Sequence, residues 1–545
     1  MFKKRFIILC ALFLALFLTA CGRKERPVDL AVKEGILIID NGSEPEGLDP
    51  HTVTGFPEHR ILMALYEGLV IENPDVPGDY LPGVADTWIS NPDHSVWTFH
   101  IRDNAHWSNG DRLVAEDFVY AHNRILNAEL GSEYAEMLYP ILNAEAFHDG
   151  EISDFSEVGV KALDDSTLQY TLKGPTAYFP QMLMHYTYWP VHRPTIEAFN
   201  AFSDRTTNWA RPGTLIGNGP FVLKNWVTNQ VIEVEANPHY WDAATVKLKG
   251  IRFLPIDNRD TAERMFLAGQ LHKTDSVPFN KRRHYRDTRS DVFHEDEFFA
   301  DSYVGVNCRK SPLDDIRVRR ALYLAINDQL ITESVTFNGD AALCWVPPVI
   351  QNYDNSIKRD YDPEMARALL AEAGYPGGEG LRPLDLLIVN TDTNKIVSET
   401  YQEMWRSELG VKINVVNEEW KVFLDSLAQG NFDLFTMAWI GDYIDPSTFL
   451  GMMTEGNGNN HTGWVNKEYD RLLEESSYIA DPDARYKVLG QAEDILMTEL
   501  PILPSSTNPR VYLLDNRVRG WKSHPIDNHP YKFIYFAPEN ESESE

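Results

Sequence analysis

Three short apolar segments decide the fold of this chain: LDLLIV at residues 384–389, VKINV at 411–415 and FDLFTMAW at 432–439. The stretches between them, 394–409 and 420–428, carry apolar side chains at helical spacing. Strands that alternate with helices predict a βαβαβ unit with parallel strands and right-handed crossovers. Because ligands of such sheets bind beyond the carboxyl ends of the strands, the loop IGDY that ends the third strand is a candidate binding edge.

Elsewhere the chain mixes helix and strand signals. Asp362 and Pro363 are typical of a helix start, and Gly374 is typical of its end. A second helix is expected after Asp315, and VIEVE at 231–235 is expected to form a short strand. These signals together predict an α/β fold with α+β parts.

The first residues have the order of an export signal. A basic start, KKR at 3–5, precedes an apolar run at 6–18 that is shorter than the ~20 residues of a bilayer span. LTAC at 18–21 resembles the bacterial lipobox, in which the cysteine is lipidated and becomes the mature amino terminus. We therefore predict a lipoprotein signal peptide at 1–20 and a lipid on Cys21 that tethers the protein to a membrane.

The chain is strongly acidic, with 81 Asp and Glu against 50 Lys and Arg and a formal net charge of −31. Such a surface repels phosphate backbones, which argues against a nucleic-acid partner. The 545 residues are enough for more than one domain. The acidic tail at 539–545 is expected to be disordered.

Known catalytic and metal-binding motifs are missing from the sequence. It contains no phosphate-binding GxxxxGK[ST] loop, no GxSxG elbow and no HExxH pair. His94, His100 and His106 lack the spacing of metal ligands. We therefore expect no catalytic residue, no metal and no cofactor. Cys308 and Cys344 could pair in an oxidising compartment, and the sequence leaves that open.

Several motifs in chain order resemble one known family. They are EGLDPH at 46–51, LYEGL at 65–69, PGVADTW at 82–88, WTFHIRDNAHWSNG at 97–110, NGPF at 218–221, NPHYW at 237–241 and RVRRAL at 317–322. They look like the oligopeptide, dipeptide and nickel solute-binding proteins of ABC importers (solute-binding protein family 5), and most like their periplasmic oligopeptide binders. Matching segments run from about residue 41 to 535 and cover nearly the whole mature chain.

The resemblance implies a two-lobed, three-domain periplasmic-binding-protein-like fold of type II, similar to cluster C. The expected parts are lobe one (36–66, 190–298 and 508–538), an extra domain attached to it (67–189) and lobe two (299–507). Two crossovers near 299 and 508 would then form a hinge, and closure would bury the ligand.

The resemblance also implies ligand-binding residues. In the oligopeptide binders the loop that contacts the peptide's free amino end has the form Trp-x-x-Asp-Tyr, and Asp442 takes the place of its aspartate. The backbone around 54–56 matches a segment that pairs with an extended peptide in β-fashion, and Tyr134 matches a pocket tyrosine. The implied ligand-binding residues are Thr54, Gly55, Phe56, Tyr134, Trp439, Ile440, Gly441, Asp442 and Tyr443.

Other positions depart from the family pattern. The basic residues with which some members bind the peptide carboxylate align with Thr336 and Thr436 here, and a third position aligns with Lys395 or Asn394. We keep Lys395 and Thr436 as candidate ligand-binding residues. Thr54 replaces an acidic residue. A disulfide found in enteric members would fall on Ala300 and Ile440 and is therefore absent.

The sequence thus predicts an exported, lipid-anchored binding protein that captures oligopeptides for an ABC permease and is not an enzyme. It would work in the periplasm or at the outer face of the cytoplasmic membrane. Two alternatives remain open: the same fold binding a metal chelate, a sugar or a signalling peptide, and a secreted hydrolase that uses a pair of its many carboxylates.

Overall fold

A computed structural model describes residues 25–336, 340–342, 344–350, 352–353, 361–507 and 509–538. The predicted signal peptide, the predicted lipidation site at Cys21 and the predicted tail at 539–545 lie outside these residues. No helix in the described ranges is both long enough and apolar enough to cross a membrane.

The largest sheet has six strands in the order β13-β17-β12-β16-β14-β15. Strand β14 is parallel to both β15 and β16, which confirms the predicted βαβαβ unit. The elements of this unit are β14 (Leu384–Val389), α13 (Asp392–Leu409), β15 (Ile413–Glu418), α14 (Trp420–Gln429) and β16 (Leu434–Ile440). The other three strands are β13 (Asp340–Ala341), β17 (Ile502–Thr507) and β12 (Ala300–Val306).

Strand β15 begins two residues later than predicted. Gly410 ends α13 in the left-handed conformation with φ 69°, and its N–H bonds back to the carbonyls of Trp405 and Arg406. Pairing with β14 then runs from Ile413 to Glu418. The helix cap therefore takes up the residues that alternation alone had placed in the strand.

One edge of β16 is only partly paired. The strand pairs with β12 along its whole length, from Leu434 to Ile440. On its other side it pairs with β14 only at Leu434 and Phe435. Within the described residues, the segment 436–440 therefore offers backbone groups that a further extended chain could pair with.

Helices cover this sheet and include both helices predicted near residues 315 and 362. Asp362 caps its helix by accepting a hydrogen bond from the N–H of Met365 at 2.9 Å. The covering helices are α10 (Ile316–Leu324), α11 (Asp328–Ile331), α12 (Pro363–Glu372), α16 (Lys467–Ser476) and α17 (Pro482–Glu499).

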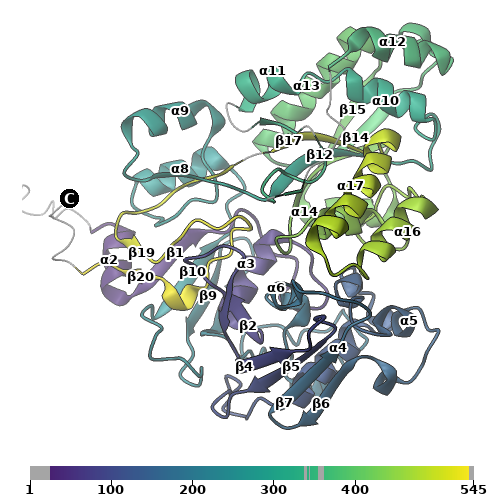
Figure 1. Ribbon diagram of the computed structural model, residues 1–545. Coiled ribbons are helices and arrows are strands. Elements are labelled where there is room, and N and C mark those ends of the chain that lie inside the picture. Colours follow the sequence, from purple (N-terminus) through teal and green to yellow (C-terminus); the bar gives the residue numbers. More distant parts are fainter. Residues whose placement is uncertain are drawn as a thin grey trace, which may run out of the picture.

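Two four-stranded sheets lie in the other half of the molecule (Figure 1). The first is β1 (Ile36–Asp40), β10 (Gly250–Leu254), β9 (Val231–Ala236) and β8 (Phe221–Val227), with helices α2 (Pro27–Glu34), α3 (Phe56–Leu65), α8 (Arg259–Leu267) and α9 (Phe279–Thr288). The second is β4 (Ala85–Ser90), β5 (Val96–Ile101), β7 (Thr167–Thr171) and β6 (Val160–Asp164), with helix α4 (Ala115–Ile125) against it. Each of the three sheets comes from a different one of the three expected parts.

The chain passes between the two halves twice, at adjacent places. On the side of the two four-stranded sheets, strand β11 (Phe293–Asp296) pairs with β18 (Arg510–Leu513). On the side of the six-stranded sheet, the next strand of each connection pairs in turn, β12 with β17. The two connections therefore lie side by side, as a hinge would require.

The cysteines and histidines of the described residues form neither a disulfide nor a metal-ligand cluster. Cys308 and Cys344 form no disulfide. Ala300 and Ile440, where the resemblance would place a bridge, are direct cross-strand partners. No cluster of three potential metal ligands occurs within the described ranges.

Candidate functional site

Three adjoining cavities lie between the two halves of the molecule. The inner compartment has a volume of about 230 Å³ and extends from Asp442 to Ala438. The arginine compartment, about 410 Å³, shares Met437 and Ala438 with it and continues to Arg282. A linking compartment of about 240 Å³ shares Trp420 with both.

The inner compartment brings together residues that are far apart in the sequence. Most of the expected ligand-binding residues line it: Thr54, Gly55, Phe56, Tyr134, Trp439, Ile440, Gly441 and Asp442. They come from all three sheet-bearing parts of the chain, and this convergence is what the two-lobed arrangement predicts for a ligand site.

The buried carboxyl group of Asp442 is the feature of this compartment that bears most directly on the kind of ligand it binds. Its side chain is only 10% exposed. Oδ2 accepts a hydrogen bond from the Thr448 hydroxyl at 3.2 Å, and Oδ1 lies 3.5 Å from the Tyr134 hydroxyl. Burial raises the pKa of Asp442 to about 7, although these two hydroxyls lower it in part. The charged form is therefore costly here unless a cation binds.

His185 does not supply that cation. Its Nε2 lies 3.5 Å from Oδ1 of Asp442, but burial, and then the nearby His59, keep the pKa of His185 well below its ordinary value. The imidazole is therefore neutral and contacts the Thr187 hydroxyl through Nδ1 at 2.9 Å. No Lys or Arg lines the inner compartment within the described residues. Asp442 is thus a buried carboxylate suited to a cationic ligand group.

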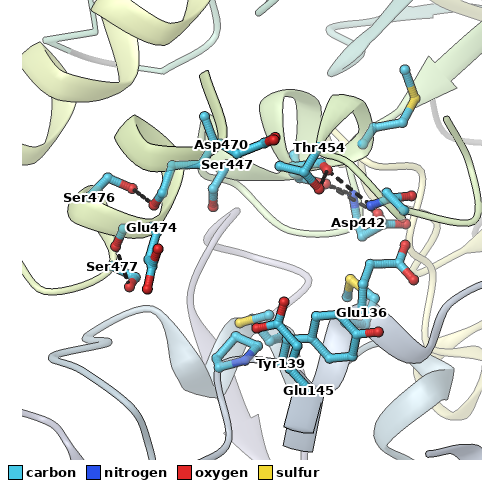
Figure 2. A pocket seen from close by; sticks show the side chains of 18 of the residues that line it. Glu136, Tyr139, Glu145, Asp442, Ser447, Thr454, Asp470, Glu474, Ser476 and Ser477 are labelled. Atoms are coloured by element: carbon cyan, nitrogen blue, oxygen red, sulfur yellow. Dashed lines mark hydrogen bonds between the residues drawn. The ribbon is translucent and has the colours of Figure 1, made fainter. Parts of the chain in front are cut away.

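An outer cavity of about 570 Å³ adjoins Asp442 on its other side. Figure 2 shows Glu136, Tyr139 and Glu145 on one wall and Ser447, Asp470 and Glu474 on the other. Glu136 points toward Asp442, and burial raises its pKa to about 8. Carboxylates therefore gather on the outer-cavity side of Asp442, in a cavity that Lys and Arg side chains also line, whereas Asp442 is the only carboxylate among the described residues that line the inner compartment.

Local packing fixes the loop that carries Asp442. A side chain at Gly441 would place a Cβ only 2.4 Å from the Phe299 ring, so only glycine fits. The Trp439 indole N–H donates to the Thr448 carbonyl at 2.9 Å, and the N–H of Asp442 donates to the Thr448 hydroxyl at 2.9 Å. Tyr443 stacks on Tyr178 with ring centres 5.7 Å apart and lines the outer cavity instead.

The segment 54–56 faces this loop across the inner compartment. Gly55 is extended, with φ −89° and ψ 151°, and helix α3 begins at Phe56. The Gly55 carbonyl accepts the first hydrogen bond of this helix, from the N–H of His59 at 3.1 Å. Residues 54 and 55 pair with no strand of the described chain, so their remaining backbone groups could pair with an extended ligand.

Two of the residues weighed for the carboxylate-binding positions line the same compartment. Thr436 lines the arginine compartment, and its hydroxyl is buried without a hydrogen-bond partner. Of the two residues weighed for the third position, Asn394 lines this compartment and Lys395 lines none of the three compartments or the outer cavity. The side chain of Thr336 lies outside what the structure describes.

Sequence reasoning missed four residues of this site. His185, Thr448 and Glu136 surround Asp442, and Arg282 lies in the arginine compartment. None belongs to a local pattern. Only Thr448, six residues after Asp442, could have been suspected as part of the same loop.

Comparison with known proteins assigns the family. Residues 79–461 match the sequence model of the bacterial extracellular solute-binding proteins, family 5 (middle region). The chain belongs to this family. The periplasmic oligopeptide-binding protein OppA of Salmonella typhimurium is 34% identical over 522 residues, which is 93% of each chain. The resemblance seen in the sequence motifs is therefore confirmed.

Solved structures support the same fold. OppA of Haemophilus influenzae, in complex with the peptide RPPGFSPFR, matches with a TM-score of 0.88 and 28% identity over 93% of this chain and 99% of that one. The murein tripeptide-binding protein MppA of Escherichia coli matches with a TM-score of 0.88 and 32% identity over 92% of this chain and 99% of that one. The predicted two-lobed family fold is confirmed.

A second structure of MppA bears on how the lobes are arranged. Its unliganded open form has the same 32% identity and covers 93% of this chain and 98% of its own, but matches with a TM-score of only 0.64. Because sequence and coverage hardly differ from the first MppA structure, the drop reflects how the parts are arranged. The present structure is far from that open arrangement and close to the peptide complex of OppA.

Family membership also decides the class of activity. The members named above are substrate-binding proteins. This chain is likewise a substrate-binding protein and not an enzyme, and the alternative of a secreted hydrolase falls.

Proposed function

We propose that this protein captures oligopeptides through their free amino end and delivers them to the permease of an ABC importer. The observation that carries the proposal is the buried carboxylate of Asp442, which has no cationic partner within the described residues. A peptide ammonium supplies the missing charge, and a charge-assisted hydrogen bond forms in a site closed to water.

Two backbone segments suit the rest of such a ligand. The partly paired edge of β16 at 436–440 and the extended residues before α3 border the inner compartment. Pairing with main-chain groups binds peptides of varied sequence, because every residue offers the same N–H and C=O. The relatives named for oligopeptides support this ligand class.

The three expected parts then act as two lobes around the ligand. Lobe one with its extra domain contributes Gly55 and Tyr134, and lobe two contributes Asp442. The adjacent crossovers near 299 and 508 serve as the hinge. A peptide that contacts both lobes stabilises the closed arrangement over the open one.

The proposal is tested by identifying what the protein carries. Protein purified from its native host and then denatured should release a mixture of peptides with free amino termini, detected by mass spectrometry. Release of a single non-peptide compound, or of peptides that are all blocked at the amino end, would contradict it.

Export and anchoring complete the proposed role. The signal at 1–20 directs export, and a lipid on Cys21 holds the protein near its permease. A Cys21→Ser variant should be released from membranes without detergent, whereas the parent stays bound, as membrane fractionation would show. Multiple acyl chains are needed for stable anchoring. A variant that remains in the membrane fraction would rule out this attachment point.

Peptide affinity should depend on pH in a predictable direction. The ligand binds the ionised form of Asp442, whose pKa of about 7 falls when an ammonium binds. Affinity is therefore highest between about pH 7 and 8 and drops by up to about tenfold per unit below pH 7. It drops again above pH ~8, where the peptide amine loses its proton.

Calorimetric titration between pH 5 and 9 measures this profile. His185 and Tyr134 stay neutral in this range, since burial lowers the pKa of the first and raises that of the second well above 10. Glu136 does titrate nearby, so a Glu136→Gln variant is the control and should keep the acid limb. A flat profile from pH 5 to 7 would show that Asp442 does not meet the ammonium.

A further inference from the structure

The arginine compartment has an unusual charge for so acidic a protein. Arg259, Arg282 and Arg510 line it, and no Asp or Glu does so within the described ranges. It lies at the opposite end of the cavity series from Asp442, with Met437 and Ala438 shared between the two ends. The series is thus acidic at one end and basic at the other.

Arg510 is already neutralised, and Arg282 is not. Arg510 bonds to Asp275 at 2.6 Å and to Asp527 at 3.0 Å. The side chain of Arg282 donates one hydrogen bond, from Nε to the Val277 carbonyl at 3.3 Å. Its Nη1 is buried without a hydrogen-bond partner, and the residue is only 4% exposed.

No carboxylate of the described chain forms an ion pair with Arg282. Glu295, whose charge acts on Arg282, bonds to Arg286 at 2.7 Å instead. Burial, and then the positive charges of Arg259, Arg286 and Arg510, lower the pKa of Arg282 to about 8. A bound anion would offset the free-energy cost of burying this positive charge without a partner.

Helix ends add to the positive potential. Helix α9 begins at Phe279, one turn before Arg282, and helix α13 begins at Asp392. Phe279, Thr393 and Asn394 all line the compartment, so both amino-terminal ends face it. The N–H groups and dipole of a helix amino terminus favour a negative group.

Some family members bind the peptide carboxylate with basic residues at positions that hold uncharged Thr436 and Asn394 in this compartment. We propose that the Arg282 guanidinium, from a different element, binds the carboxylate in this chain. This inference rests on the proposed function and adds a second recognition point to it. A peptide held at Asp442 and extended along β16 reaches Ala438 after about four residues at ~3.3 Å each. Peptides of about five residues or more would therefore place their carboxyl end in this compartment.

The test compares matched peptides of three to eight residues as free acids and as carboxyl-terminal amides, by calorimetric titration. At the lengths that reach the compartment, amidation should weaken binding to the parent roughly ten- to hundredfold, the range of a hydrogen bond to a charged group. An Arg282→Gln variant should bind the acid and the amide equally. An Arg282→Lys variant should recover part of the preference.

Two controls separate the possible causes. Arg289, at the end of the same helix, pairs with Asp291 at 2.9 Å outside the compartment, and Arg289→Gln should leave the preference unchanged. An amidated peptide with a glutamate near its end distinguishes a side-chain carboxylate from the terminal one, because it should bind tightly only if the side chain can occupy the compartment.

The outcomes are distinct from those for the proposed function. If amidation has no effect at any length while acetylation of the amino end still weakens binding, the role of Arg282 falls and the peptide assignment stands. If neither modification changes the affinity, both the role of Arg282 and the peptide assignment are wrong. Should Arg282→Gln fail to fold, as judged by its melting curve, the parent's amide comparison and the lysine variant decide the question.

Discussion

An Asp442→Asn variant is expected to lose peptide affinity by roughly a hundred- to a few thousandfold. Removing one partner of a buried ion pair costs ~3–5 kcal/mol, because the other charge is left without a counter-charge in a site closed to water. The amide keeps the size of the side chain and can still accept from Thr448. Melting of the ligand-free protein should therefore change little.

The matched control is Glu474→Gln, which removes a carboxylate from the outer cavity without touching the inner compartment. It should bind peptide like the parent in the same calorimetric titration. If both variants lost peptide affinity to the same extent, the loss would reflect the overall charge and not a contact to the ligand. An Asp442→Asn variant with the parent's affinity would remove this residue from the site.

The second large effect concerns stability. Arg124, on α4, is completely buried and forms a two-pronged ion pair with Asp49 at 2.6 and 2.9 Å. The Trp209 indole also donates to Asp49 at 3.1 Å. An Asp49→Ala variant leaves the guanidinium buried without its partner, so the free energy of unfolding should fall by ~3–5 kcal/mol.

Urea unfolding followed by tryptophan fluorescence measures this loss. Adding Arg124→Met to Asp49→Ala should recover part of it, because an apolar side chain does not need a counter-charge. Asp86→Ala, which breaks an exposed contact with His100, is the surface control and should cost less than ~1 kcal/mol. Equal losses for Asp49→Ala and Asp86→Ala would contradict the account of the buried pair.

The sequence was most informative where structure is local. Apolar periodicity was sufficient to predict the βαβαβ unit, and the rule for parallel sheets pointed to the loop that carries Asp442. The error in the predicted bounds of β15 also has a local cause. Alternation placed the start of β15 two residues early, because the cap at Gly410 uses those residues.

The partners of the key groups could not be predicted in this way. His185 and Glu136 reach Asp442 only because the extra domain packs against lobe two, and no spacing in the sequence encodes that contact. The helical register of α13 also determines which of two neighbouring residues lines the arginine compartment. Asn394 lines the arginine compartment, but Lys395, one residue further on, does not. Alignment alone could not choose between them.

The most direct test of the central claim is a calorimetric titration with one peptide in two forms, free and N-acetylated, near pH 7.5. Acetylation removes the positive charge and leaves every side chain in place. If Asp442 binds the peptide ammonium, the acetylated form should bind at least about a hundredfold more weakly. Equal affinity for the two forms would contradict amino-end recognition and the proposed function with it.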